Sequence, residues 1–131
     1  MKPTKLGIGT FKISDPNIYS SKDIFEYLLF SIQSGLNLFD TSDSYGNGYI
    51  EKQIGKLLKS KLIKRKDILI STKFGQGIGF NYQEVEKSLN NSLKRLNTDY
   101  IDYYFFHSGT NKQFDNEEVW NFLNKKKKKV R

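Results

Sequence analysis

The sequence predicts an α/β fold in which about four strand–helix units follow one another. Short apolar runs with strand character alternate with segments whose apolar residues recur every three to four positions, as on one face of a helix. The expected strands end near Thr10, Asp40, Lys73 and His107, so successive ends lie 30, 33 and 34 residues apart. This spacing is typical of β–α–β units with parallel strands. No linker divides the 131 residues, which we expect to form one domain.

The first half of the chain carries two of these units. Residues 6–10 are the first expected strand, and a helix begins near Ser20 or Ser21, because serine is a favoured N-cap residue. Gly35 is suited to the left-handed conformation that ends many helices, and residues 36–39 form the second strand. Each helix presents one apolar face, made of Ile24, Phe25, Leu28, Leu29 and Ile32 in the first and of Ile50, Ile54, Leu57 and Leu58 in the second.

The second half repeats the pattern. Residues 68–72 are expected to form the third strand, and the glycine-rich loop of residues 75–79 follows it. A helix over residues 82–96 and a fourth strand over residues 100–106 come next, and a last helix covers residues 116–128. The inward residues of these two helices are expected to be Val85, Leu89, Leu93 and Leu96, and then Val119, Trp120 and Leu123.

The positive charge of the chain is concentrated at its C-terminal end. The formal net charge is +8, and the basic run of residues 125–131 contains five lysines and one arginine, which leaves +2 for residues 1–124. Lysines are favourable at a helix C-terminus, so we expect a solvated helix end. A polyanion-binding tail is the alternative, and no specific nucleic-acid partner is predicted.

Composition and hydropathy exclude several classes of protein. The chain has no cysteine, so it has neither a disulfide framework nor thiolate chemistry. No apolar run approaches the roughly 20 residues that span a bilayer, and the N-terminus reaches polar and glycine residues too early for a signal sequence. We therefore expect a cytoplasmic protein without a membrane partner.

Two architectures are compatible with the repeated units: an open doubly wound sheet and a (β/α)8 barrel. A nucleotide-binding open sheet concentrates its signal in the first strand–helix turn, and the turn at residues 7–10 (GIGT) lacks the third glycine of the dinucleotide fingerprint. In a barrel, catalytic residues come from the carboxyl ends of several strands. Because Asp40, Lys73 and His107 each follow a different apolar run, the barrel is favoured.

These three residues, with Tyr45 in the loop after Asp40, form a chemically coherent group. A tyrosine hydroxyl has a free pKa of about 10, and a nearby ammonium group lowers the pKa by stabilising the phenolate. A carboxylate orients the ammonium, and a histidine can bind or protonate a polar substrate atom. Singly, Asp40 can cap a helix, Lys73 can be a solvated charge, and a lone histidine is more often structural. Together they can protonate a carbonyl oxygen while a nicotinamide cofactor delivers hydride.

The sequence around these residues resembles the aldo/keto reductase family in four blocks that cover nearly the whole chain. Residues 6–10 are similar to the family's opening strand. Residues 39–48 (FDTSDSYGNG) resemble its F-D-T-A-x-x-Y-G segment, with Ser42 in place of the common alanine. The remaining similar segments are residues 70–73 (ISTK), residues 89–107, and residues 129–131 (KVR), which resemble the entry to the family's fifth strand.

The resemblance implies an NAD(P)H-dependent carbonyl reductase or alcohol oxidoreductase. Tyr45 would be the general acid, Lys73 its partner, Asp40 the counter-ion of the lysine, and His107 the residue that orients a small carbonyl or alcohol substrate. Asp40 with Gly9, Thr10 and Phe11 would approach the nicotinamide and ribose of NADP. No metal is implied. Phe11, Phe74 and Phe80 are candidates for an aromatic pocket, although ordinary packing also explains each of them.

The resemblance also implies that residues 1–131 form the N-terminal half of a TIM barrel of eight strands. We expect a truncated or split gene, because the family's later strands and cofactor-binding loops lie outside these residues. A complementing C-terminal half or self-association would then be needed for tight NADP binding. The alternative is a non-catalytic remnant or interaction module that retains the four residues.

Overall fold

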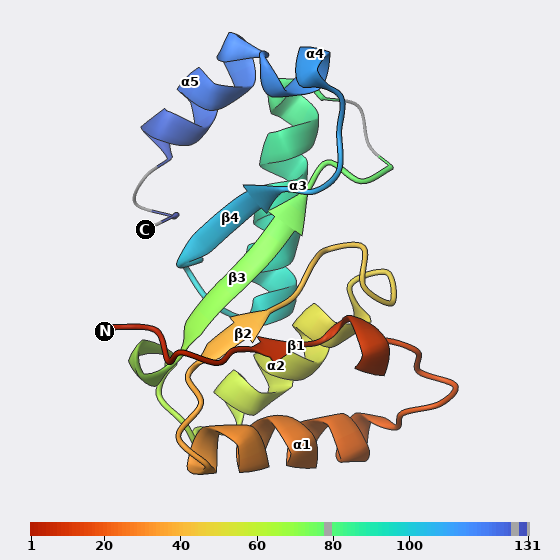
Figure 1. Cartoon of the computed structure of the whole chain (residues 1–131), viewed down its shortest axis with the longest axis vertical. Coiled ribbons are helices and arrows are strands. Elements are labelled where there is room, and N and C mark those ends of the chain that lie inside the picture. Colours follow the sequence, from red (N-terminus) through yellow and green to blue (C-terminus); the bar gives the residue numbers. More distant parts are fainter. Residues whose placement is uncertain (78–79, 127–128, 131) are drawn as a thin grey trace.

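A four-stranded parallel sheet forms the centre of the molecule, in a computed structural model that describes residues 1–77, 80–126 and 129–130. The strands lie in chain order, β1-β2-β3-β4, and every neighbouring pair is parallel. Their bounds are β1 (Ile8–Gly9), β2 (Leu38–Asp40), β3 (Leu69–Phe74) and β4 (Tyr103–Phe106) (Figure 1). The predicted α/β fold is confirmed, and the sheet is open, with β1 and β4 at its edges.

The strands are shorter than the sequence predicts at the two edges. Leu6 lies in the predicted first strand, but its side chain is 71% exposed and the paired residues are only Ile8 and Gly9. In the fourth unit, Ile101 precedes β4 and instead forms an isolated parallel bridge with Val130. The bridge places Val130 beside the fourth unit, where a fifth parallel strand would begin.

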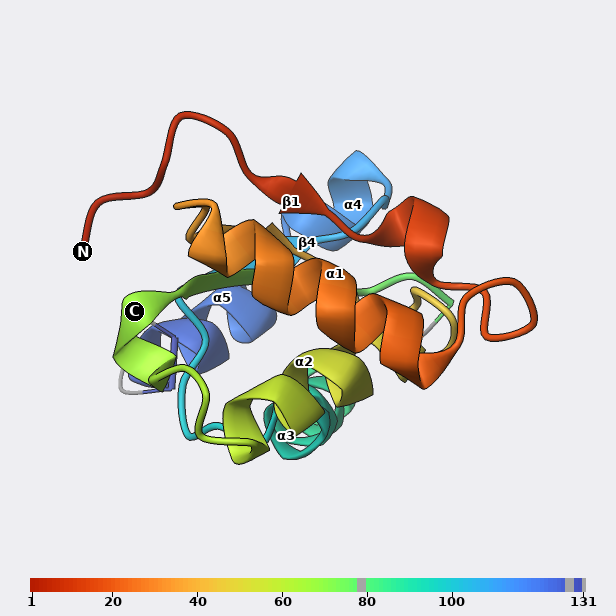
Figure 2. The ribbon, with the colours of Figure 1, turned by 90° about the horizontal axis from the view of Figure 1, so that it is seen from below.

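Three helices cover one face of the sheet: α1 (Ser21–Gln33), α2 (Tyr49–Lys59) and α3 (Tyr82–Leu96) (Figures 1 and 2). As predicted, α1 begins after Ser20, whose side chain accepts a hydrogen bond from the backbone of Asp23 in a capping box. Gly35 follows α1 with φ +91°, a conformation that favours glycine. Asn97 caps the C-terminal end of α3 in the left-handed conformation.

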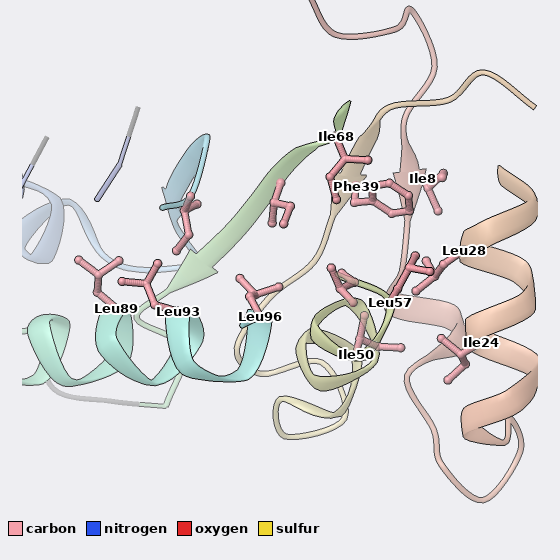
Figure 3. Close-up of a cluster of buried hydrophobic side chains, with 13 residues drawn as sticks. Ile8, Ile24, Leu28, Phe39, Ile50, Leu57, Ile68, Leu89, Leu93 and Leu96 are labelled. Atoms are coloured by element: carbon pink, nitrogen blue, oxygen red, sulfur yellow. The ribbon is translucent and has the colours of Figure 1, made fainter. Parts of the chain in front are cut away.

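The main core lies between this face of the sheet and the helices (Figure 3). Phe39 of β2 and Ile70 of β3 are fully buried in this core, and the polar residue that follows each of them faces the opposite side of the sheet, because successive strand residues face opposite sides. The other buried residues are Ile8, Ile24, Leu28, Ile50, Ile54, Leu57, Ile68, Leu89, Leu93, Leu96 and Ile101. The helix faces read from the periodicity are therefore confirmed.

The C-terminal region differs from the prediction. It contains two helices, α4 (Asn111–Phe114) and α5 (Glu117–Lys125), and the predicted helix residues 127–128 lie outside the described residues. Val119 is buried against Phe74 as expected, but Trp120 is only partly buried. Its indole N–H donates to the backbone oxygen of Phe114. The prediction of a buried Trp120 was wrong, because the unpredicted helix α4 supplies a partner away from the core.

Arg65 joins β3 to the start of the fourth unit at the amino ends of the strands. Its guanidinium donates to the carboxylate of Asp102 at 2.5 Å and to the backbone oxygen of Ile68 at 2.8 Å. It also lies over the ring of Tyr100, 3.9 Å from the centroid. The Asp102 carboxylate accepts a further bond from the backbone N–H of Ile70. The short segment before β3 that holds Arg65 is the 3-10 helix η2 (Arg65–Asp67).

In the part of the chain that the structure describes, no helix has both the length and the apolar character needed to cross a membrane.

Candidate functional site

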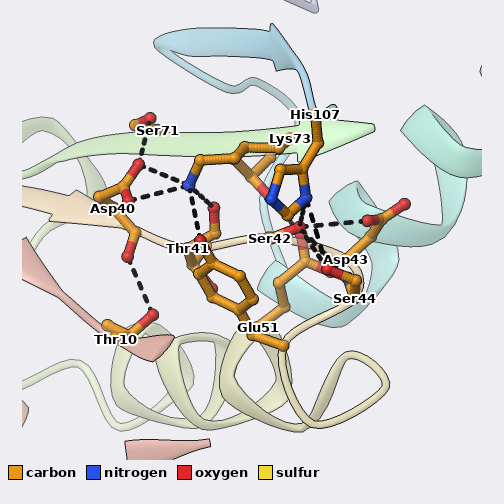
Figure 4. A network of polar contacts seen from close by, with 12 residues as sticks. Thr10, Asp40, Thr41, Ser42, Asp43, Ser44, Glu51, Ser71, Lys73 and His107 are labelled. Carbon is orange, nitrogen blue, oxygen red and sulfur yellow. Dashed lines mark hydrogen bonds and ion pairs between the residues drawn. The ribbon is translucent and has the colours of Figure 1, made fainter. Parts of the chain in front are cut away.

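Asp40 and Lys73 meet at the carboxyl ends of β2 and β3. Asp40 pairs with Ser71 in the parallel register, so Lys73, two residues further on, projects from the same face of the sheet. Its Nζ atom lies 2.8 Å from each carboxylate oxygen of Asp40 and 2.9 Å from the backbone oxygen of Thr41 (Figure 4). Ser71 Oγ donates to the same carboxylate at 3.0 Å. The ammonium and the carboxylate are thus held together from two adjacent strands.

Tyr45 completes the hydrogen bonding of the lysine. Its hydroxyl oxygen is 3.3 Å from Lys73 Nζ, so each of the three ammonium donors has an acceptor. The loop between β2 and α2 turns sharply there, since the backbone N–H of Tyr45 donates to the carbonyl of Ser42. The next residue, Gly46, has φ +56°, and a Cβ atom there would collide with the backbone oxygen of Ser14. The loop can therefore bring Tyr45 over the lysine only with glycine at position 46.

His107 comes from the end of β4 and faces Tyr45. Its backbone N–H donates to the carbonyl of Phe74 at 2.7 Å, which continues the strand ladder by one residue. The imidazole and phenol rings are 5.8 Å apart in an edge-on arrangement. Its Nδ1 atom lies 3.1 Å from the hydroxyl oxygen of Ser42. The structure therefore brings all four residues singled out in the sequence to one edge of the sheet.

The end of the first strand lies beside this group. The predicted cofactor residues there differ in how far they are buried. Thr10 is fully buried, and its N–H and hydroxyl groups both donate to the backbone oxygen of Asp40. Gly9 is exposed, and a Cβ atom placed on it would meet nothing within 4 Å. Phe11, in the 3-10 helix η1 (Phe11–Ile13), is 59% exposed and packs against the ring of Tyr45. Thr10 therefore supports Asp40, whereas Gly9 and Phe11 face open space.

A cavity of about 400 Å³ opens between these side chains. It is lined by Phe11, Ser44, Tyr45, Gln76 and His107. A second hollow of about 470 Å³ shares Ser44 and Gln76 with it and runs along the polar face of α3. The two neighbouring hollows provide room for a small molecule beside the Tyr45 side chain.

The aromatic pocket considered in the sequence forms only in part. Phe11 lines the cavity, but Phe74 is fully buried and stacks on Phe80 and Tyr104 in a second, smaller core. Phe80 also packs on Phe106. Packing is therefore the structural role of both Phe74 and Phe80.

Two further sets of polar contacts at this end of the sheet carry no clear sequence signal. Ser42 and Ser44 contact the histidine from a distant part of the chain. Glu51 of α2 is fully buried and accepts hydrogen bonds from Thr72 at 2.7 Å and from Arg95 of α3 at 2.6 Å. The sequence hints at the burial of Glu51 through its position one turn before Ile54 on the apolar stripe and through its place in the segment that resembles the family.

No group of three or more histidine, cysteine, aspartate or glutamate residues that could hold a metal ion exists among residues 1–77, 80–126 and 129–130.

The fold and the site together define a class of protein. Parallel strands in sequential order with helices on one face match the first strand–helix units of a (β/α)8 barrel, and the lysine–carboxylate–tyrosine–histidine group lies at the carboxyl ends of the strands, where such barrels carry their active sites. The aldo/keto reductase family model matches residues 5–131. The chain belongs to the aldo/keto reductase family.

Individual relatives agree with this assignment. L-galactose dehydrogenase of Arabidopsis thaliana is 42% identical over 76 residues, which are 56% of this chain and 24% of that protein. NAD(P)H-dependent D-xylose reductase I,II of Candida tropicalis is 31% identical over 106 residues, or 78% of this chain and 30% of that one. The holo form of an aldo-keto reductase from Bacillus halodurans superposes with a TM-score of 0.81 at 27% identity, covering 99% of this chain and 45% of that structure.

The chain therefore spans 24% and 30% of the length of these two curated relatives. In the superposed structure it corresponds to the first strand–helix units of the barrel.

Proposed function

We propose that this chain contributes the proton-donating part of an NAD(P)H-dependent carbonyl reductase or alcohol oxidoreductase. The observation that carries the proposal is the position of Lys73 Nζ, which contacts both Asp40 carboxylate oxygens and the Tyr45 hydroxyl at once. A cation in this position stabilises negative charge on the phenol oxygen, as proton donation requires. Membership of the aldo/keto reductase family supports the same reaction class.

The proposed roles follow from the geometry. Tyr45 donates its proton to the carbonyl oxygen of a substrate in the adjoining cavity, and Lys73 stabilises the phenolate that remains. Asp40 holds the ammonium in place with two contacts of 2.8 Å. His107 hydrogen-bonds the same substrate oxygen from the other side of the cavity and fixes its orientation. The nicotinamide cofactor supplies the hydride that no side chain can donate.

The residues of the first strand fit the nicotinamide end of such a cofactor. Gly9 has open space where a side chain would be, Phe11 is exposed, and the side chain of Asp40 is 43% exposed. These three residues form the proposed contact surface for NADP. Thr10 enters the proposal as a positioning residue, because its two hydrogen bonds hold the backbone of Asp40 and its side chain is buried.

The proposed domain is the N-terminal half of a TIM barrel, with residues 125–131 as a basic C-terminal run. The sheet face opposite the helices supports this proposal, since Tyr103 and Phe105 of β4 are 38% and 52% exposed there and stack on one another. In a closed barrel such inward residues are covered by other strands. A complementing half or a second copy of the chain is the proposed cover.

The same exposed face favours a second candidate, an interaction module that retains the four site residues without catalysing a reaction. Exposed aromatic residues next to an unpaired strand edge are suited to protein contacts. This candidate predicts partner binding through β4 and no affinity for a nicotinamide cofactor.

A cofactor titration distinguishes the two candidates. We expect saturable binding of NADPH, followed by nicotinamide fluorescence, and weaker binding by Asp40→Asn. No saturable binding at millimolar NADPH would reject the enzyme role for this chain. A mass measurement in solution then shows whether two copies pair.

Carbonyl-dependent NADPH oxidation tests the role of Tyr45. In the active form, alone or with a complementing half, Tyr45→Phe is expected to lower kcat by about 10²–10⁴-fold, the usual contribution of a general acid. Tyr27→Phe on the exposed side of α1 is the matched control, since Tyr27 is 45% exposed and remote from the cavity. Equal rates for Tyr45→Phe and this control would exclude Tyr45 as the acid.

A further inference from the structure

The His107 ring makes all its hydrogen bonds to described residues through one nitrogen, Nδ1. Its partners are the hydroxyl groups of Ser42 at 3.1 Å and Ser44 at 3.5 Å (Figure 4). The Ser42 contact is the shorter one, and Ser42 is fully buried. The other nitrogen, Nε2, is therefore the one left for a molecule in the cavity that His107 lines.

Ser42 also contacts the carboxylate of Asp43. Ser42 Oγ lies 3.3 Å from Asp43 Oδ1, and the second carboxylate oxygen of Asp43 accepts a bond of 2.8 Å from Ser88 on α3. Ser88 in turn accepts from the hydroxyl of Tyr104 at 3.3 Å. Burial raises the pKa of Tyr104 above its ordinary value, which keeps that hydroxyl protonated and donating. Asp43 is thus fixed from α3 and β4 on the side away from Ser42.

The serine has one proton and three acceptors within reach, which are the Asp43 carboxylate at 3.3 Å, the Ser44 hydroxyl at 3.0 Å and His107 Nδ1 at 3.1 Å. Hydrogen bonds to an ionised acceptor are about twice as strong as those between neutral groups. The proton of Ser42 therefore favours the carboxylate of Asp43. Ser42 Oγ can then interact with the imidazole only as an acceptor, which requires a proton on Nδ1.

We propose that Ser42 and Asp43 are positioning residues that keep the proton of the neutral His107 ring on Nδ1. Nε2 is then an acceptor in the neutral ring and becomes a donor when the ring takes up a second proton. At Nε2, a neutral ring can accept a hydrogen bond from the hydroxyl of an alcohol, whereas an imidazolium can donate one to a carbonyl oxygen. The relevance to substrates rests on the proposed function, but the position of the proton does not.

The other charged groups near the ring do not compete for Nδ1. Lys73 and Asp40 form their own ion pair on the far side of the Tyr45 phenol, whose ring centroid is 5.8 Å from that of the imidazole. The Asp43 carboxylate is therefore the charged group that reaches the ring through hydrogen bonds among the described residues.

The sequence makes this proposal directly measurable, because His107 is the single histidine of the chain. The ¹⁵N chemical shifts of its two ring nitrogens, recorded at about pH 9, well above the ordinary histidine pKa of about 6.5, show which nitrogen carries the proton. We expect the Nδ1-protonated form to dominate in the 131-residue chain without cofactor. Predominance of the Nε2-protonated form would overturn the proposal even if NADPH binds.

Three variants separate the contributions. Ser42→Ala is expected to shift the tautomer ratio toward Nε2 by about tenfold, as the loss of a bond linked to a charged group implies. Ser44→Ala removes the 3.5 Å contact with the ring and the 3.0 Å contact with Ser42 Oγ but keeps both Ser42 and Asp43, so it is the control in which the Nδ1-protonated form should still dominate. Asp43→Asn retains an acceptor without charge and should give a smaller shift than Ser42→Ala. An unchanged tautomer ratio in Ser42→Ala would overturn the role of Ser42, and an unchanged ratio in Asp43→Asn would overturn the role of Asp43. Backbone amide spectra verify that each variant is folded.

Discussion

Two cation–carboxylate pairs lie close together in this fold, and they differ in what surrounds them. Glu51 is completely buried, and its two oxygens are occupied by Arg95 and by Thr72. Asp40 is 43% exposed, and its partner Lys73 has one donor directed at a tyrosine hydroxyl beside an open cavity. The first pair joins α2, β3 and α3, whereas the second is accessible from solvent.

The surroundings of the two pairs, and not their contact distances, separate the structural ion pair from the one proposed to take part in chemistry. Both pairs have short contacts, of 2.6 and 2.8 Å, so distance does not separate them. A buried pair whose hydrogen-bonding groups are all occupied stabilises one arrangement of the elements. A pair that is exposed on one side and contacts a titratable hydroxyl can act on a bound molecule.

Breaking the buried pair should have the largest effect on stability. Glu51→Gln leaves Arg95 without its counter-ion in a water-poor site, and we expect a loss of about 3 kcal/mol in the free energy of unfolding. Urea denaturation measures this value. Glu26→Gln is the control, because the Lys22–Glu26 pair is 82% and 64% exposed and separated by 3.9 Å. A loss no greater than that of the control would remove the distinction between the pairs.

Gly55→Ala should disturb the buried pair indirectly and somewhat less. A Cβ atom at position 55 of α2 would collide with the backbone oxygen of Arg95, so the two helices approach closely only because this residue is glycine. Overpacking of this kind costs about 1–3 kcal/mol. The same urea titration measures it, with the Lys73–Asp40 contact expected to remain. Gly9→Ala, which meets nothing within 4 Å, is the matched control.

Asp40→Asn should have a smaller effect on the free energy of unfolding than either change. The carboxylate is partly solvated, and such ion pairs contribute about 0–1 kcal/mol. The asparagine oxygen can still accept from Ser71. A destabilisation equal to that of Glu51→Gln would mean that the exposed pair is structural as well.

The smallest effect is expected at the fully exposed carboxylate of Asp23, and only in acid. Hydrogen bonds from the side chain and backbone of Ser20 lower its pKa below the ordinary 3.8. The stabilisation is therefore present above about pH 4 and is lost as the pH falls through the lowered pKa. The thermal midpoint of Asp23→Asn should approach that of the wild type as the pH is lowered from about 6 to below 3. A difference independent of pH would contradict the assignment.

Much of the fold was predictable because the local strand and helix patterns of the sequence agree with the parallel arrangement of the whole sheet. Asp40, Lys73 and His107 each end an apolar run, and parallel strands place such ends at one edge. The edges of the sheet were less predictable, because Leu6 has a strand-like side chain, yet the residues of the first unit that pair with β2 in the described part of the chain are Ile8 and Gly9. The exposure of Trp120 depends on α4, a helix of four residues that is too short to show a period.

The polar contacts were the least predictable part of the candidate site. Ser42 and His107 are 65 positions apart, and neither residue type implies the other. Glu51 and Arg95 are 44 positions apart, and each is a residue type that usually lies on a solvated face. Side-chain pairs of this kind follow from the register of the sheet and the packing of the helices.

The Arg65 contacts have a consequence for how such a protein can change over evolutionary time. They join β3 to the fourth unit at the amino ends of the strands, while Lys73 and His107 occupy the opposite ends. Substitutions, insertions or deletions in the loops beside the cavity therefore leave the anchoring of the strands intact. Variation in those loops can alter which molecules fit without a loss of strand alignment, so one end of the sheet preserves the architecture while the other is free to diversify.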